Sequence, residues 1–455
     1  MTEKLTEKIY HSVLLVIAIV LIFSAVVFTV TRALTPFLNL HRSTFERWAG
    51  KVLDAPVKVS HVSFGWHGID PEIWLQGVTI YQPKTHKVAL HVKDFYAAIS
   101  LFRSVEHLNI LPNLITLSGV KISVRDQGHG VFKINDMTVS SVGGDKTGTL
   151  NAALTKAWLL DQSRLYLRNI RINFYNASGK LFPLKVGYIN LQSSDQFHQL
   201  DGKVVLLNKH KTALHVIIHA HGSMSNARQL QASIYGKLTH VYLASWLQSK
   251  KIAGYRVAQG EGKMQYWLSW NKGHWEKAQG RVNLLNLALI PASKKPFKIK
   301  YLSSDIGWFP GAKGWRFTLD NVNLMTQDAM WPRFHFSLKK TMNNQSVHWR
   351  MGASFLEIRD VQDFLCGSTQ LKARWKTWLS RFNPSGEVSN LQVGFDGSFQ
   401  KPSHFALKTA LNHVSFRSWH KIPGIKNASA ALAFNPSQGR LTLKTRNAVL
   451  NYPSL

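Results

Sequence analysis

Side chains that could carry out acid–base, nucleophilic or metal chemistry are few in this sequence and form no recognisable catalytic set. The 455 residues contain 24 Asp and Glu and one cysteine, Cys366. No HExxH, GxSxG or paired CxxC motif occurs, so metalloprotease, hydrolase and zinc-ribbon functions have no support. The run GGDKT at 143–147 lacks the glycine before lysine and the spacing of a phosphate-binding loop, and it predicts a flexible turn. We expect a protein that is not an enzyme and uses no cofactor.

Three histidines, His215, His219 and His221 in HVIIHAHG, have the spacing of residues on one face of a β-strand. Imidazole nitrogens arranged in this way could bind a transition metal. Carboxylates are sparse nearby and the surrounding residues are apolar. We therefore expect a polar strand face and no metal site.

A tryptophan-rich stretch, MQYWLSWNKGHWEKAQG at 264–280, interleaves aromatic and basic residues. The pattern is typical of a hairpin with aromatic cross-strand packing, and base-stacking surfaces of nucleic-acid-binding proteins share it. The apolar N-terminal segment described next favours the hairpin, and we expect no nucleic-acid partner.

Residues 9–31, IYHSVLLVIAIVLIFSAVVFTVT, contain no charged side chain. At about 1.5 Å per residue, a helix of this length crosses the ~30 Å hydrocarbon core of a bilayer. A cleaved signal peptide usually has a shorter apolar region of ~7 to 15 residues before a small-residue cleavage site. We expect residues 1–35 to form a short N-terminal tip and an uncleaved transmembrane anchor, and the cations on both flanks leave its orientation open.

Residues 36–56 predict an amphipathic helix that begins near Pro36 and ends before Pro56. Its apolar stripe includes Phe45, Trp48 and Val52. Such a helix lies on a membrane surface or packs on the first sheet, and we favour the sheet.

The net charge of +32 is unevenly distributed along the chain. Residues 51–150 contain 10 basic and 8 acidic residues, whereas residues 151–300 contain 22 and 5. A basic surface of this kind is typical of a solvated face, of contact with anionic lipid headgroups or of nucleic-acid binding.

From Val57 onward the apolar residues alternate, as in β-strands with one buried face. One variation, Leu-x-x-apolar-x-apolar, occurs seven times, starting at Leu75, Leu117, Leu167, Leu238, Leu284, Leu319 and Leu411. The residue before its second apolar position is Gly77, Gly119, Asn169, His240, Asn286, Asn321 or His413. Because these residue types tolerate positive φ best, each copy predicts a bend that keeps both halves of the strand facing one interior. Residues 356–361 are expected to be a degenerate eighth copy.

The predicted fold is mainly β. An N-terminal transmembrane helix is followed over 57–455 by an elongated, curved antiparallel β-sheet groove built of repeats. A few short helices are expected, chiefly at 150–160 and 371–379, and turns at Ser178-Gly179, Asp201-Gly202 and Asn271-Lys272-Gly273. A sheet with one continuous apolar face has to close into a sandwich, split into separate β domains or be covered by an apolar ligand such as lipid chains.

The anchor favours the third solution, a groove for acyl chains. We expect the groove to be lined by alternating apolar residues of the repeats, namely Ile115, Leu117, Val120, Ile122, Val124, Leu165, Leu167, Ile170, Ile172, Phe174, Val282, Leu284, Leu287, Leu289, Phe317, Leu319, Val322 and Leu324.

Four stretches, FERWAGKVLDAPVKVSHVSFGWHGIDPEIWLQGVTI, YGKLTHVYLASWL, FNPSGEVSNLQVGF and HKIPGIKNASAALAF, occur in an order that resembles the N-terminal part of YhdP-type proteins of the AsmA-like superfamily. The resemblance covers essentially the whole chain. It implies a single-pass inner-membrane protein whose residues 1–35 form a cytoplasmic tip and the anchor, with most of the chain in the periplasm. It also implies repeating β-groove units that carry phospholipid between the inner and outer membranes and support outer-membrane lipid homeostasis.

The partners that this resemblance implies are phospholipid, the inner membrane and envelope proteins at the distal end. YhdP-type proteins are far longer, and this chain stops at NAVLNYPSL inside an expected strand, so we expect a truncated C-terminus. The alternative is a membrane-anchored β-repeat scaffold that binds envelope assembly proteins and fills its interior with its own side chains.

Overall fold

The structure is a computed structural model. It describes residues 42–53, 55–83, 86–106, 111–128, 131–135, 137–140, 164–194, 196–207, 211–222, 229–247, 251–291, 296–343, 346–369, 371–398 and 401–452, together with scattered positions between 14 and 29. The chain is mainly β, as the alternating pattern predicts. It divides into unit 1, Met1–Asn208 with His219–Ser225, and unit 2, Lys209–Ile218 with Asn226–Leu455.

Unit 1 is a sheet in which most strands pair with strands that lie near them in the sequence. Its elements are α2 (Arg42–Leu53), β1 (Val57–Lys58), β2 (His61–His67), β3 (Asp70–Tyr81), β4 (Val88–Ile99), α3 (Leu101–Glu106), β5 (Pro112–Ser118), β6 (Lys121–Gly128), β7 (Val131–Ile134), β8 (Met137–Ser140), β9 (Arg164–Tyr175), β10 (Leu181–Ser193) and β11 (Phe197–Leu206). β1 and β2 both pair with β3, and antiparallel pairing continues through β4 to β5. β9, β10 and β11 are likewise antiparallel neighbours.

One pairing in unit 1 corrects the prediction of a purely antiparallel sheet. β5 and β6 both pair with β9 in parallel, so that Leu117 lies opposite Leu167 and Ile122 lies opposite Ile172. β7 and β8 form an antiparallel extension from the far part of β6. The alternation of apolar residues fixes which face is buried and carries no information about strand direction, so the parallel pairing could not be predicted from it.

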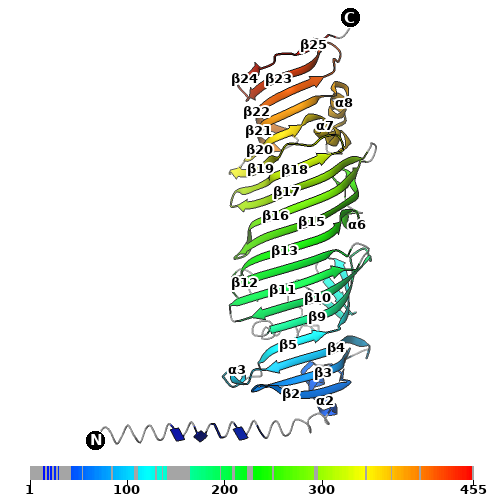
Figure 1. Ribbon diagram of the computed structural model, residues 1–455, viewed down its shortest axis with the longest axis vertical. Coiled ribbons are helices and arrows are strands. Elements are labelled where there is room, and N and C mark those ends of the chain that lie inside the picture. Colours follow the sequence, from blue (N-terminus) through cyan, green and yellow to red (C-terminus); the bar gives the residue numbers. More distant parts are fainter. Residues whose placement is uncertain are drawn as a thin grey trace, which may run out of the picture. The chain divides into compact units, whose positions relative to one another are not determined.

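Unit 2 is built of successive antiparallel strands, which Figure 1 shows stacked in chain order, with α7 and α8 together at one end of the strands. After β12 (Ala213–His221), which has residues in both units, its elements are β13 (Gln231–Tyr242), α6 (Leu243–Leu247), β14 (Lys251–Ile252), β15 (Tyr255–Asn271), β16 (His274–Ile290), β17 (Phe297–Gly311), β18 (Gly314–Thr326), β19 (Phe334–Asn343), β20 (Ser346–Glu357), α7 (Ile358–Gly367), α8 (Ala373–Phe382), β21 (Ser385–Ser398), β22 (Lys401–Phe416), β23 (Gly424–Phe434), β24 (Gly439–Leu443) and β25 (Val449–Asn451).

Local predictions have mixed outcomes. The turns at Ser178-Gly179 and Asn271-Lys272-Gly273 join neighbouring strands, whereas Asp201-Gly202 lies inside β11. Residues 356–361 are not an eighth copy of the motif, because α7 begins at Ile358. The helix expected at 371–379 is α8, and the one expected at 150–160 lies outside the described residues.

Most of the predicted anchor lies among residues that the structure leaves undescribed. Nine positions between Leu14 and Thr29 are described, and all nine are helical. Across the described parts of the chain, no helix is both long and apolar enough to span a membrane.

A helix covers part of the sheet in each unit. In unit 1, Ala49 and Phe45 of α2 pack into a core with Val59 and Val62, and the Glu46 carboxylate accepts a hydrogen bond from the Val59 amide at 2.8 Å. The stripe of α2 therefore packs on the first strands of the sheet.

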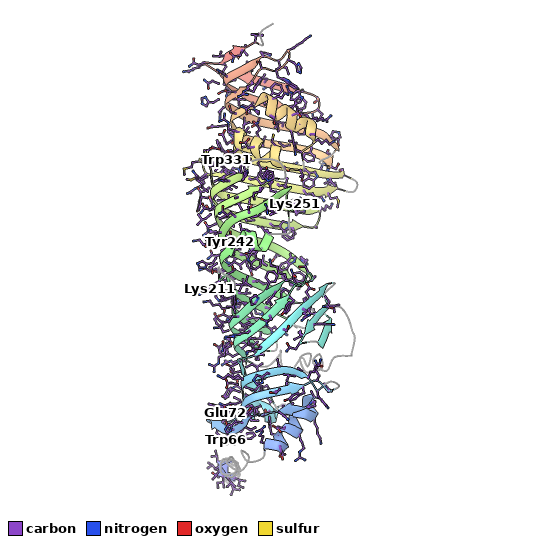
Figure 2. The ribbon with its side chains drawn as sticks, turned by 90° about the vertical axis from the view of Figure 1, so that its right-hand side faces the viewer. Trp66, Glu72, Lys211, Tyr242, Lys251 and Trp331 are labelled. Carbon is purple, nitrogen blue, oxygen red and sulfur yellow. The ribbon has the colours of Figure 1, made fainter. Side chains whose placement is uncertain are left out.

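In unit 2, Phe364 of α7 stacks on Tyr255 with 5.1 Å between ring centroids. The Asp360 carboxylate accepts hydrogen bonds from Thr326 Oγ1 at 3.0 Å and from Trp331 Nε1 at 2.7 Å. Trp331, labelled in Figure 2, is buried. These contacts fix α7 against the ends of the strands.

Candidate functional site

The seven bend residues of the repeated motif all adopt the backbone conformation that the sequence predicts. Their φ angles lie between 51° and 69°, at Gly77, Gly119, Asn169, His240, Asn286, Asn321 and His413. Register shifts accompany the bends in β13, β18 and β22. Each bend changes the phase of the strand by one residue, so that apolar side chains on both sides of it stay on the same face.

Two further bends lie outside the seven motif copies. Asn390 and Asn427 have φ angles of 53° and 59°. They occupy the bend position in Val388-x-x-Leu391 and Ile425-x-x-Ala428. The motif requires leucine at its first position, and a motif that allowed any apolar residue there would include both.

Cross-strand register aligns the apolar residues of unit 1 into rows. Directly opposite residues on neighbouring strands share a face. One such row crosses seven strands of unit 1 and is apolar throughout: Phe64, Ile73, Ala97, Ile115, Leu165, Leu191 and Leu200.

The two motif copies that contribute ten of the predicted lining residues lie side by side in this sheet. Ile115, Leu117, Ile122 and Val124 face Leu165, Leu167, Ile172 and Phe174 respectively. Between these pairs, the Arg171 amide next to Ile170 donates to the Val120 carbonyl at 2.8 Å. The parallel pairing thus brings all ten residues onto one face.

Unit 2 contains a longer row of the same kind. It runs through ten strands, at Ile234, Leu268, Ala278, Trp308, Phe317, Leu338, Met351, Val393, Leu407 and Phe434. A second row joins the predicted residues Leu284 and Leu324 through Leu302. We call the face that carries the rows of a unit its apolar face.

Burial of the predicted lining residues varies along the apolar faces. Of the eighteen, Ile115, Val120, Ile170, Leu287 and Val322 are buried, and the remaining thirteen are half-buried. In unit 2, Leu289 pairs with Phe297, whose ring contacts Phe364 of α7. The apolar face of unit 2 is therefore closed at the α7 end and partly open to solvent along the other rows.

Many residues of the apolar faces were absent from the prediction. Ile189 and Leu184 of β10 and Phe336 and Leu338 of β19 lie in the same rows as predicted residues. Their strands carry no copy of the motif, and simple alternation was the signal that could have identified them.

Charged side chains gather on the opposite face of unit 2. Lys237, Gln265, Arg281 and Asp305 are successive cross-strand partners. The Arg281 guanidinium donates to Asp305 at 2.7 Å, and this hydrogen bond, with a second from Asn321, lowers the pKa of the Asp305 carboxyl. Beside them lies a cavity of about 230 Å³, lined by Lys237, Leu238, Lys263, Met264, Gln265, Arg281 and Asn283.

The structure describes only some of the other candidates for chemistry. His219 and His221 lie against the ring of Phe197, with centroids 6.2 and 5.1 Å away. Cys366 is buried in α7. The described part of the chain contains no group of three or more His, Cys, Asp or Glu side chains that could hold a metal. The GGDKT run lies outside the described residues.

These features define a class of β-repeat protein, in which bent strands keep one apolar face and helices cover only part of it. The chain belongs to the YhdP family, because the family described as YhdP protein matches residues 1–455. Among curated proteins it is similar to the intermembrane phospholipid transporter YhdP of Escherichia coli strain K12, with 19% identity over 466 residues. The match covers 96% of this chain and 34% of the relative, so the chain spans about one third of that protein's length. No solved structure matches the chain.

Proposed function

We propose that this protein carries phospholipid between the inner and outer membranes of the cell envelope, with the acyl chains lying on its apolar faces. The observation that carries the proposal is the uninterrupted apolar row across each sheet, left half-buried by the protein's own helices. An open apolar face of this size is unfavourable in water unless something apolar covers it. The E. coli relative is an intermembrane phospholipid transporter, which supports phospholipid as that cover.

The rest of the proposal concerns location. Residues 9–31 anchor the chain once through the inner membrane, and the body of 57–455 lies in the periplasm, where it supports outer-membrane lipid homeostasis. The uncharged N-terminal stretch and the membership of the YhdP family support this placement. The transport needs no catalytic step.

Photo-crosslinking from two matched pairs of positions tests the lipid contact. Ile122 and Ile172 lie opposite each other on the apolar face of unit 1, and Lys121 and Arg171 lie opposite each other at the preceding positions, where both are exposed. A photoreactive residue is placed at each position in the full chain in cells, and the adducts are identified by mass spectrometry. Phospholipid adducts are expected at Ile122 and Ile172 and not at Lys121 or Arg171.

A charge on the apolar face tests transport itself. Ile172→Asp places a carboxylate where acyl chains would lie, and its desolvation is costly. Phospholipid transfer should be lost, while Arg171→Asp on the neighbouring exposed position should leave it intact.

Well-folded protein without adducts at either apolar position would favour the alternative, a membrane-anchored scaffold that binds envelope assembly proteins. Normal transfer by a folded Ile172→Asp variant would show that this face carries no lipid.

A further inference from the structure

The apolar face of unit 2 ends in an aromatic row that contains one lysine. Beyond the row of Phe317 and Leu338, the next residues on the same face are Pro310, Trp315, Lys340, Trp349 and Phe395, which are successive cross-strand partners on β17 to β21. Trp315, Lys340 and Trp349 are half-buried. The aromatic row therefore lies between the apolar rows and the tips of the hairpins.

Lys340 is unusual in its position. On β18 to β21, the described residues of this face from Trp315 to Leu319, with their cross-strand partners, include no other charged side chain. An ammonium on an apolar face is costly to desolvate unless a partner compensates it. No ion pair joins Lys340 to any carboxylate in the described ranges, and the nearby Asp396 pairs with His348 one position further along β20 and β21.

The rings around Lys340 hold it in a defined place. The Lys340 ammonium lies over the Trp349 ring, 5.6 Å from its centroid. Trp315 meets Trp349 edge to face at 5.8 Å, and Phe395 stacks on the other side at 6.3 Å. Trp349 Nε1 donates to the Gly397 carbonyl at 3.1 Å, which fixes the orientation of the indole.

Tryptophan and lysine together are characteristic of the boundary between hydrocarbon and water, where the indole spans the boundary and the ammonium reaches polar groups. An ammonium without a carboxylate partner attracts an anion. On the apolar side of the row, β19 runs six residues from Lys340 to Phe334, or about 20 Å at ~3.3 Å per residue. Half of a bilayer's ~30 Å hydrocarbon core is about 15 Å, so an acyl chain fits along this stretch.

We propose that Lys340, held by Trp315 and Trp349, binds the phosphate of a phospholipid whose acyl chains extend along β18 to β20 toward α7. The inference rests on the proposed function, and it assigns the headgroup to one end of the strands and the acyl tails to the other. Bound lipids in this part of unit 2 then share one orientation.

Lysine acylation of the wild-type full chain tests the site without any substitution. Lys340 and Lys339 are neighbours on opposite faces, and Lys339 is exposed. Their modification by an amine-reactive acetylating reagent is measured by mass spectrometry for the detergent-washed chain alone, with phosphatidylglycerol vesicles and with sodium phosphate. The vesicles should protect Lys340 several-fold relative to Lys339, and inorganic phosphate should not.

Substitutions give an independent readout. With a photo-crosslinker at Leu338, Lys340→Met should reduce phospholipid adducts several-fold, whereas Lys340→Arg and the control Lys339→Met should retain them. The Ile172 cross-link in unit 1 reports whether lipid binding occurs at all.

Equal acylation of Lys340 and Lys339 with and without lipid would overturn the headgroup site, and a persistent Ile172 adduct would leave the proposed function standing. Equal protection by phosphate and by vesicles would mean a site for free anions and would also overturn the inference. Loss of the Ile172 adduct together with an unprotected Lys340 would contradict both.

Discussion

A single backbone angle recurs at the bend of every motif copy, and the residue found there is glycine, asparagine or histidine. For other L-residues the left-handed region costs roughly 1–2 kcal/mol because Cβ approaches the carbonyl oxygen. Asn286 gives a clean test, because it is exposed in β16 with a φ of 52°. Asn286 does not belong to the apolar rows, so its substitution leaves these rows unchanged.

Asn286→Ala should lower the free energy of unfolding of unit 2 by about 1 kcal/mol, whereas Asn286→Gly should change it by less than about 0.5 kcal/mol. Denaturant unfolding measures both. Gln279→Ala, at an exposed position of the same strand without positive φ, is the control. An equal loss for alanine and glycine would mean that the bend does not depend on the backbone preference.

Tyr96 in β4 carries the clearest pH dependence. Burial, followed by the charge and hydrogen bond of Glu72, raises its pKa from the ordinary 10.0 to about 12. Below pH 10 the phenol is protonated in both folded and unfolded chains. Between pH 10 and 12 the unfolded chain releases the proton and the folded one keeps it, so the free energy of unfolding falls as pH rises.

Burial also raises the pKa of Tyr188, Tyr255 and Tyr266, so ultraviolet titration should show several late-ionising tyrosines in the wild type and one fewer near pH 12 in Tyr96→Phe. Glu72→Gln removes the negative charge beside Tyr96 and should bring that pKa down toward 10. An unchanged number of late-titrating tyrosines in Tyr96→Phe would contradict the assignment.

The residue-level predictions succeeded where side-chain chemistry limits backbone geometry, as at Asn169, Asn286 and His413. The proposed role of Lys340 could not be predicted from the sequence, since it depends on which strands flank β19. In the sequence, a lysine two residues after Leu338 has the pattern of an ordinary exposed cation. Only the strand register places it between Trp315 and Trp349.

Among the elements, helix α7 closes the apolar face of unit 2 at one end of its strands. Its Asp360 is buried and accepts hydrogen bonds from Trp331 and Thr326. Asp360→Ala leaves the buried Trp331 Nε1 donor unpaired, at about 1–3 kcal/mol, whereas Thr326 Oγ1 can still donate to the Ala329 carbonyl at 3.2 Å. We expect α7 to detach more often from the strand ends and amide hydrogen exchange in α7 to rise.

Asp363→Ala, at an exposed position of the same helix, should raise exchange in α7 much less. Unchanged protection in the Asp360→Ala variant would mean that the aromatic contacts of Phe364 hold the helix without this carboxylate.

Element types were more predictable than their connections. Alternation identified the strands, the apolar stripe identified α2, and a short helix was expected where α8 lies. Residues 356–361 were misread because a Leu-x-Ile-x-x-Val spacing suits both a bent strand and a helix start. The order β4, β5/β6, β9 depends on long-range pairing, which local patterns do not encode.

The charge of the whole molecule, +32, sets how it meets anionic surfaces. Each basic residue near an anionic membrane contributes about 1 kcal/mol, and salt screens this attraction. We expect the purified chain to adsorb to phosphatidylglycerol vesicles at low salt and to be released when salt is raised to about 0.5 M. Lipid held on the apolar faces should resist the same wash.

Sedimentation with vesicles, followed by lipid analysis of the released protein, separates the two kinds of binding. Release of all phospholipid by salt alone would mean that the lipid is held only by surface charge. Ile172→Asp should lower the salt-resistant fraction and leave the adsorption nearly unchanged.

The parallel pairing of β5 and β6 with β9 has a consequence for how the chain folds. The pairing of Leu117 can form only after Leu167, fifty residues later in the chain, has been synthesised. Most neighbouring strands of unit 2, in contrast, are joined by short turns. Contacts between residues distant in sequence slow folding, because loop closure costs entropy before the contacts form. During synthesis, unit 2 can grow one hairpin at a time, but β5 and β6 present an unpaired edge until β9 has emerged. That interval is when chaperone binding, mispairing and aggregation of the nascent chain should concentrate.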